Sequence, residues 1–171
     1  MNMHNASYWI NRLGMKPHVE GGFYAEVYQS PLHFQKEQLP ASFQGNRPAA
    51  THIYYLLQQG QRSAFHRIAS DELWHHYDGG SLLIYEITGH GILQTHQLGI
   101  DDQPGERPFC FIQAGNWFGA LPAETADFVL VGCTVAPGFD FDEFEMADTE
   151  TLVAQFPDQE EIIRTCNQRA R

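Results

Sequence analysis

The stretch from Gly60 to Gly79, GQRSAFHRIASDELWHHYDG, gathers side chains that could do acid–base chemistry. We predict two short strands joined by a polar turn, so alternate residues share a face. His66 then shares a face of the first strand with Ala64 and Ile68, and Glu72 shares a face of the second strand with Trp74 and His76. A carboxylate that faces an imidazole can fix its tautomer and raise its basicity. His66 and Glu72 are therefore the catalytic candidates of a predicted pocket.

The elements that must position this pair are short strands. Runs rich in Val, Ile and aromatic residues, separated by Gly and Pro turns, predict at least eight of them. Strands are expected at 20–30, 50–57, on both sides of the turn at 69–71, and at 81–88, 92–99, 109–113, 116–121 and 128–135. Short helices are expected at 7–15 and at 149–167, broken at Pro157, with loops at 31–48 and 100–108. This pattern is typical of an all-β barrel or double-sheet jelly roll.

Composition narrows the class of protein. The chain has 171 residues, 43% of them hydrophobic, which is enough for one domain with a real core. The net charge of -11 argues against a nucleic-acid partner and an anionic membrane, which call for clustered Lys and Arg. The three cysteines have no CxxC spacing, so we expect a reduced, cytoplasmic protein. No segment has the length of a membrane span or the core of a signal peptide.

Five segments in chain order resemble one family of the cupin superfamily, long labelled a domain of unknown function. They are EGGFYAEVY, THIYYLL, SAFHRIASDELWHHYDG, QAGNWFGA and GCTVAPGFDFDEFE. In the third segment and the residues before it, Gly60, His66, Glu72 and Gly79 match the first cupin motif in frame. The resemblance implies a cupin jelly roll (a double-stranded β-helix) with short terminal helices. It also implies one domain over residues 1–171 with its barrel at about 20–146. It does not supply a biochemical role.

The sequence departs from the family pattern at the metal position. A metal-holding cupin typically uses three histidines and one glutamate. Here Ile68 takes the second histidine position, and Phe118 takes the histidine position of the second motif. His66 and Glu72 would be the only matching ligands for a divalent metal, with His76 as a candidate third. We therefore expect a site without the usual metal.

Other side chains are expected to line the pocket. Trp74 and Trp117 could form an aromatic wall, although such residues also fill cores. His76 shares the face of Glu72, and Gln113 replaces the proline of the second motif with an amide that could point inward. A tyrosine at the barrel mouth could donate a proton, and the sequence does not select among Tyr24, Tyr54 and Tyr85.

These observations leave several functions open. The first is a cupin that binds a small, sugar-like or aromatic molecule. The second is a metal-independent epimerase or isomerase, because GGFYAE and SAFHR resemble segments of the deoxysugar-nucleotide 3,5-epimerases, which share this barrel. That resemblance implies His66 as base, Glu72 as its partner and a tyrosine as acid. Diphosphate substrates call for convergent arginines, however, and few lie in or near the barrel region.

Two further alternatives are a metal-dependent dioxygenase or isomerase, and a structural cupin with a vestigial site. The last predicts that substitutions of His66 and Glu72 alter only stability. Any of the four is compatible with a homodimer, because jelly rolls leave open sheet edges. The strand at 20–30 is the edge that we expect to pair.

Overall fold

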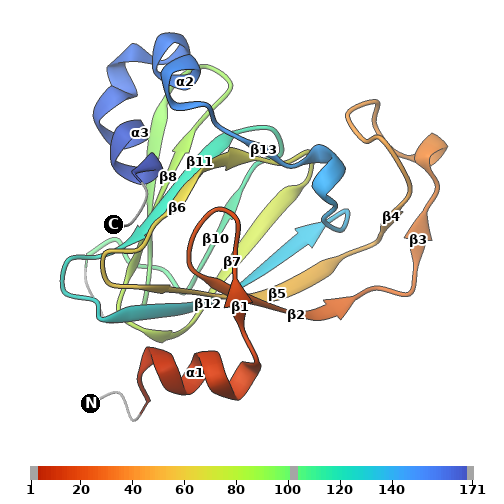
Figure 1. The fold of residues 1–171 in the computed structure, drawn as a ribbon. Helices are drawn as coiled ribbons and strands as arrows, with labels where there is room; N and C mark the ends of the chain where they lie inside the picture. The colour runs from red at the N-terminus through yellow and green to blue at the C-terminus, as the bar shows by residue number, and fades with distance from the viewer. Residues whose placement is uncertain (1–3, 101–103, 169–171) are drawn as a thin grey trace.

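The computed structural model describes residues 4–100 and 104–168, and two antiparallel sheets face each other in it (Figure 1). The first sheet has six strands in the order β1-β2-β5-β12-β7-β10. Their bounds are Lys16–Pro17 (β1), Phe23–Gln29 (β2), Thr51–Gln58 (β5), Phe128–Ala136 (β12), Asp71–Gly79 (β7) and Phe109–Ile112 (β10).

The second sheet has five strands in the order β13-β6-β11-β8-β9. Their bounds are Glu145–Met146 (β13), Ser63–Arg67 (β6), Trp117–Pro122 (β11), Leu82–Ile87 (β8) and Leu93–Leu98 (β9). The predicted strands at 81–88 and 92–99 appear as β8 and β9, which form a hairpin that pairs from Leu82 with Leu98 to Ile87 with Leu93. Strands close in sequence cross between the sheets, which is how β6 and β7 come to lie on opposite walls.

The main core fills the space between the two sheets. β12 runs through the middle of the first sheet and is buried over most of its length. Its inward residues pack against inward residues of the second sheet, including Ile84, Leu98 and Phe118. Alternation along the strands decides which side chains can reach the interior.

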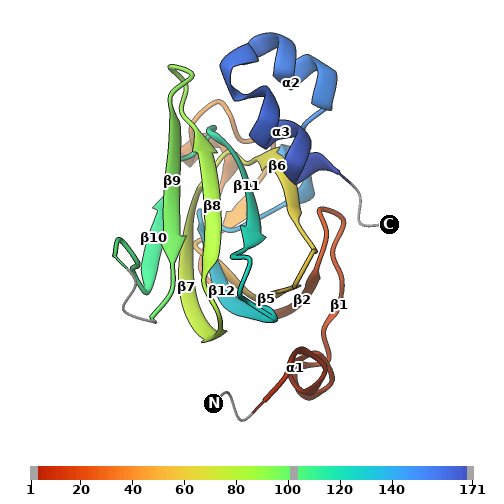
Figure 2. The ribbon, with the colours of Figure 1, turned by 90° about the vertical axis from the view of Figure 1, so that its left-hand side faces the viewer.

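Three short helices cover the outer faces of the sheets (Figure 2). α1 (Ala6–Leu13) begins at Asn5, whose side chain accepts a hydrogen bond from the Tyr8 amide, and ends at Gly14. It packs on the first sheet over Leu56 and Leu130. α2 (Thr149–Gln155), the 3₁₀ turn η3 (Pro157–Gln159) and α3 (Glu160–Asn167) cover the second sheet, with the predicted break at Pro157. Within the described residues, no helix is long and apolar enough to cross a membrane.

The segment 31–48, predicted as a loop, contains a small sheet of its own. β3 (His33–Phe34) pairs with β4 (Arg47–Pro48), and a 3₁₀ turn, η1 (Lys36–Gln38), lies between them. Two-residue strands are too short to leave a period in the sequence, which explains the difference. This arm, residues 31–48, is tied to the 3₁₀ turn η2 (Phe141–Glu143) by the buried Arg47, which pairs with Glu143.

Candidate functional site

The candidate site lies between the two sheets at the end of β6. The chain leaves β6 in the second sheet, turns at residues 69–70 and enters β7 in the first sheet. His66 on β6 and Glu72 on β7 both face the same cavity and are 3% and 8% exposed. The two residues singled out from the sequence are therefore brought together, each on a rigid strand.

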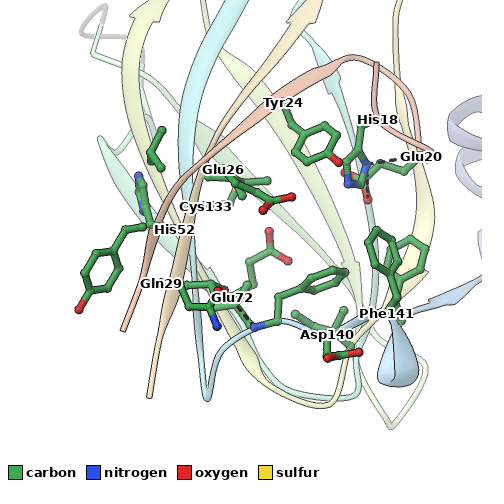
Figure 3. Close-up of a pocket in the computed structure, with 18 of the residues that line it drawn as sticks. His18, Glu20, Tyr24, Glu26, Gln29, His52, Glu72, Cys133, Asp140 and Phe141 are labelled. Carbon is green, nitrogen blue, oxygen red and sulfur yellow. Dashed lines mark hydrogen bonds and ion pairs between the residues drawn. The ribbon is translucent and has the colours of Figure 1, made fainter. Parts of the chain in front are cut away.

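The cavity has a volume of about 460 Å³, within the range of small-molecule sites. Figure 3 shows carboxyl side chains from separate elements, Glu20, Glu26 and Glu72, directed toward its interior. Apolar side chains form much of the remaining wall; they are Val27, Ile53, Ile68, Val135, Phe139, Phe141 and Phe144. The three phenylalanines pack edge to face on one another.

The direct partner of His66 is Glu20, not Glu72. His66 Nε2 lies 3.1 Å from Glu20 Oε2, and the Ser63 hydroxyl donates to Glu20 Oε1 at 3.1 Å. The side chains of His66 and Glu20 are 3% and 7% exposed, so water screens their interaction little. Sequence alternation could not find this contact, because Glu20 lies in the turn before β2.

Two glycines bring that turn against the barrel wall. Gly21 and Gly22 have φ of 116° and 69°, which side chains other than hydrogen rarely allow. A Cβ on Gly21 would lie 2.0 Å from the Arg62 carbonyl oxygen, and one on Gly22 would lie 2.6 Å from that of Leu56. The Ala64 amide then donates to the Glu20 carbonyl at 2.9 Å. In the sequence, the Gly-Gly pair of the segment EGGFYAEVY was the feature that could have pointed to the preceding Glu20.

The hydrogen bonds of His66 fix the position of a proton. Its Nδ1 lies 2.8 Å from the Ala64 carbonyl oxygen, which can only accept, so Nδ1 carries a hydrogen. Nε2 and the carboxylate of Glu20 would both be acceptors if neither held a proton. The 3.1 Å separation of Nε2 from Glu20 Oε2 is that of an ion pair, which forms when Nε2 also carries a hydrogen.

His18 is a second histidine that the sequence did not single out. The Glu20 amide donates to its Nδ1 at 3.4 Å, so its hydrogen is on Nε2. Its ring contacts the rings of Tyr24 and Tyr55 edge-on. Burial lowers the pKa of His18, partly opposed by Glu20 and reinforced by His66. His18 is thus neutral at neutral pH and completes the wall around Glu20.

Glu72 sits in different surroundings. Burial raises its pKa to about 8, the negative charge of Glu20 adds to the increase, and a hydrogen bond with the Cys133 thiol opposes it. Burial also raises the pKa of Cys133 well above its usual value. At neutral pH the site thus presents a protonated carboxyl at Glu72 in the same cavity as the ion pair of His66 and Glu20. A carboxylic acid and an imidazole in one cavity are groups that can take acid and base roles.

The donor set does not fit the metal that many cupins hold. Ile68 places a hydrocarbon in the cavity, and the Phe118 ring packs 4.1 Å from that of His66. His66 Nε2, the nitrogen on the cavity side, already faces Glu20. In the portion of the chain that the structure describes, no group of three His, Cys, Asp or Glu side chains is arranged to hold a metal ion.

The other side chains expected at the site lie outside this cavity. Trp74 points inward but is fully buried in the core against Tyr55 and Phe118. Because Phe118 faces inward, its neighbour Trp117 faces outward and packs under α2 and α3, together with Tyr85. These positions follow from strand alternation.

His76 and Gln113 are also elsewhere. His76 Nε2 lies 3.0 Å from the Gly80 carbonyl oxygen, an interaction within the turn between β7 and β8. Gln113 is exposed, and its backbone N–H donates to Oε1 of the buried Glu86 at 3.3 Å, beside a smaller hollow. Of the three candidate tyrosines, Tyr24 lines the main cavity and Tyr54 and Tyr85 do not.

Comparison with known proteins identifies the class. A family model described as "Cupin superfamily (DUF985)" matches residues 7–147, so the chain belongs to that family and has a cupin jelly-roll fold. A crystal structure from Shewanella oneidensis is 39% identical with a TM-score of 0.87, covering 97% of this chain and 99% of that one. A hypothetical protein from Leishmania major is 29% identical with a TM-score of 0.88, covering 97% and 100%.

A more distant likeness concerns the fold alone. Oxalate decarboxylase from Bacillus subtilis is 15% identical with a TM-score of 0.54, and the match covers 90% of this chain and 37% of that one. No curated protein matches the chain. The relatives thus define the architecture, and the side chains of the cavity must supply the argument about function.

Proposed function

We propose that this protein binds a small molecule in the cavity bounded by His66, Glu20 and Glu72, without the metal that many cupins hold. The observation that carries this is the convergence of buried carboxyls and an imidazole on one open cavity of about 460 Å³. Burying such groups is unfavourable unless each has a partner, and a stable core does not require them. Their shared orientation toward empty space supports a ligand.

A binding experiment with a matched pair of variants tests this. Ile68→Trp would fill the cavity, whereas Ile92→Trp places the same side chain at an exposed position outside it. Fragments are screened by NMR with ¹⁵N-labelled protein. We expect shifts at cavity residues in the wild type and in I92W and none in I68W. Fragments that shift cavity signals in no sample, or equally in all three, would contradict the proposal.

Metal content tests the second part of the proposal. Protein purified without chelator or affinity metal is analysed for iron, manganese, nickel and zinc, beside a His66→Ala variant. We expect substoichiometric metal in both samples, because isoleucine and phenylalanine take two of the usual ligand positions. Stoichiometric metal that is lost in H66A would overturn the metal-free proposal and bring forward the metal-dependent alternatives.

Proton transfer at a carbon beside a carbonyl is the second candidate function. It is favoured by the contrast between Glu72, a protonated carboxyl that could donate to a carbonyl oxygen, and the His66–Glu20 pair, which could take a proton. The test is solvent deuterium exchange into a panel of keto-sugars. Exchange that is abolished by Glu20→Gln supports an isomerase or epimerase, and no exchange across the panel would leave binding alone.

We also propose a cytoplasmic homodimer. Cys110, Cys133 and Cys166 are free thiols, which suits a reducing compartment. β2 is bordered on its outer side only by the two-residue β1, so most of its outer edge has no neighbouring strand among the described residues. A second copy could cover that edge.

A further inference from the structure

The charges of the cavity wall indicate which ligands it can accept. The ionisable side chains that line it are carboxyls, imidazoles, tyrosines and one thiol, and none of the lining residues is Lys or Arg. The four carboxyls are Glu20, Glu26, Glu72 and Asp140. Proteins that bind phosphate or carboxylate groups do so with converging Arg, Lys or backbone donors.

The two basic residues near the rim are already engaged. Arg47 pairs with Glu143, and its Nη1 lies 3.8 Å from Asp140. Lys16 Nζ lies 4.0 Å from Glu26 and 4.9 Å from the ring centre of Tyr24, on the outside of the rim. An anionic ligand would therefore lose its hydration without meeting a free Lys or Arg among the described residues of the cavity, and burying an unpaired charge is strongly unfavourable.

The partners of the cavity's carboxyl groups also argue against a cationic ligand. Glu20 has His66 as its partner, and Asp140 and Glu26 at the rim have Arg47 and Lys16 as partners. Burial and the nearby Glu20 raise the pKa of Glu72 to about 8, so Glu72 is protonated at neutral pH. None of the buried carboxyls among the cavity's described residues therefore offers an unpaired negative charge to an ammonium group. The remaining wall is largely apolar.

From these contacts we infer that the ligand is an uncharged small molecule, with an apolar face and an oxygen that can accept a hydrogen bond, and that phosphate esters and carboxylates are rejected. The inference rests on the proposed binding function and adds the ligand class. The apolar face would lie on Ile68, Val135 and the phenylalanines, and the acceptor oxygen would face Glu72. A nucleotide-linked sugar, the substrate class of the similar epimerases, does not meet this requirement.

Ligands matched in shape and differing in charge test the inference. The probes are dihydroxyacetone and its phosphate, ribose and ribose 5-phosphate, and the series benzaldehyde, benzoate and benzylamine. Each is titrated at fixed ionic strength while the NMR signals of the cavity are followed. We expect uncharged probes to bind at least about tenfold more tightly than the charged member of the same set.

Anions or the amine that bind as tightly as their uncharged counterparts would overturn the inference and leave the proposed function standing. If no probe of any charge shifts the cavity signals, the proposed function itself fails. The two failures are therefore distinguishable in one experiment.

A pair of charge-reversal variants locates the source of the selectivity. Glu26→Lys places a cation at the rim, and Glu124→Lys makes the same change in net charge at an exposed residue outside the cavity. We expect E26K to narrow the gap between ribose and its phosphate several-fold and E124K to leave it near the wild-type value. An equal response in both variants would assign the selectivity to net charge and overturn the inference.

Discussion

The buried ion pair of His66 and Glu20 is the most specific chemical feature of the candidate site. The sequence led to His66 through the cupin motif and to Glu72 as its neighbour by alternation. It could not lead to Glu20 as the partner, because that contact depends on a turn far earlier in the chain folding back onto β6. Motif spacing thus located one half of the pair, and tertiary packing supplied the other.

NMR of the histidine rings tests whether His66, in its ion pair with Glu20, has a hydrogen on Nε2 as well as on Nδ1. In protein labelled with ¹⁵N in histidine side chains, we expect both nitrogens of His66 to carry or share a proton at neutral pH. Glu20→Gln removes the acid, so Nε2 is expected to become an unprotonated acceptor while Nδ1 keeps its hydrogen on the Ala64 carbonyl. Glu124→Gln, at an exposed residue, is the control. An Nε2 resonance that is unchanged in E20Q would contradict the assignment.

The pH dependence of stability tests Glu72. In the folded protein its pKa is about 8, against 4.5 for a glutamate in water. Between these values the folded state binds more protons than the unfolded state, so the wild-type free energy of unfolding falls as pH rises. Glu72→Gln has no proton to lose. Its stability relative to wild type should rise by on the order of 3 kcal/mol between about pH 5 and pH 8.

Urea unfolding at a series of pH values measures this difference. Comparison with the wild type cancels the contributions of other titrating groups, including the opposite one from His18. Glu124→Gln should stay within about 0.5 kcal/mol of wild type throughout. A flat difference for E72Q would mean that Glu72 is already ionised in the folded protein.

At the scale of elements, the sequence predicted the helices and strands that show a periodic residue pattern or are bounded by turn residues. β8, β9, β12, α1 and the helix break at Pro157 all appear close to where the pattern placed them. The two-residue strands β3, β4 and β13 did not, because two residues show no alternation. Trp117 illustrates a second limit: type and motif position suggested a pocket wall, and only the register of Phe118 against His66 shows that it faces outward.

The buried pair of Arg47 and Glu143 connects the arm to the turn that carries Phe141. Their side chains are 3% and 7% exposed. Arg47→Ala would leave Glu143 buried without its partner and should lower the free energy of unfolding by about 3 kcal/mol. Because the double variant Arg47→Ala/Glu143→Ala removes both charges, it should be less destabilised than R47A alone.

Chemical denaturation of the single and double variants measures this coupling. Arg164→Ala breaks exposed ion pairs with Glu150 and Glu160 and serves as the control, with an expected loss below about 1 kcal/mol. Equal losses in R47A and R164A would show that the arm is held by something other than this pair.

At the scale of the whole molecule, the two sheets differ in how their edges are covered. In the second sheet, α2 and α3 pack over the outer face, and the short β13 lines the edge of β6. In the first sheet, the outer side of β2 has only β1 beside it among the described residues, and Val27 and Tyr28 on this edge are 47% and 53% exposed. Unpaired strand edges are points of association, and apolar residues on them strengthen it.

We therefore expect a homodimer through β2, which sedimentation equilibrium over a range of concentrations would detect. Val27→Asp places a charge on each side of the proposed interface, and in a two-fold dimer the two charges would lie close together, so the dissociation constant should rise at least about tenfold. Ile92→Asp makes the same kind of change at an exposed residue in the turn between β8 and β9 and should leave association unchanged. A monomeric wild type, or a dimer that V27D does not weaken, would show that this edge is not the interface.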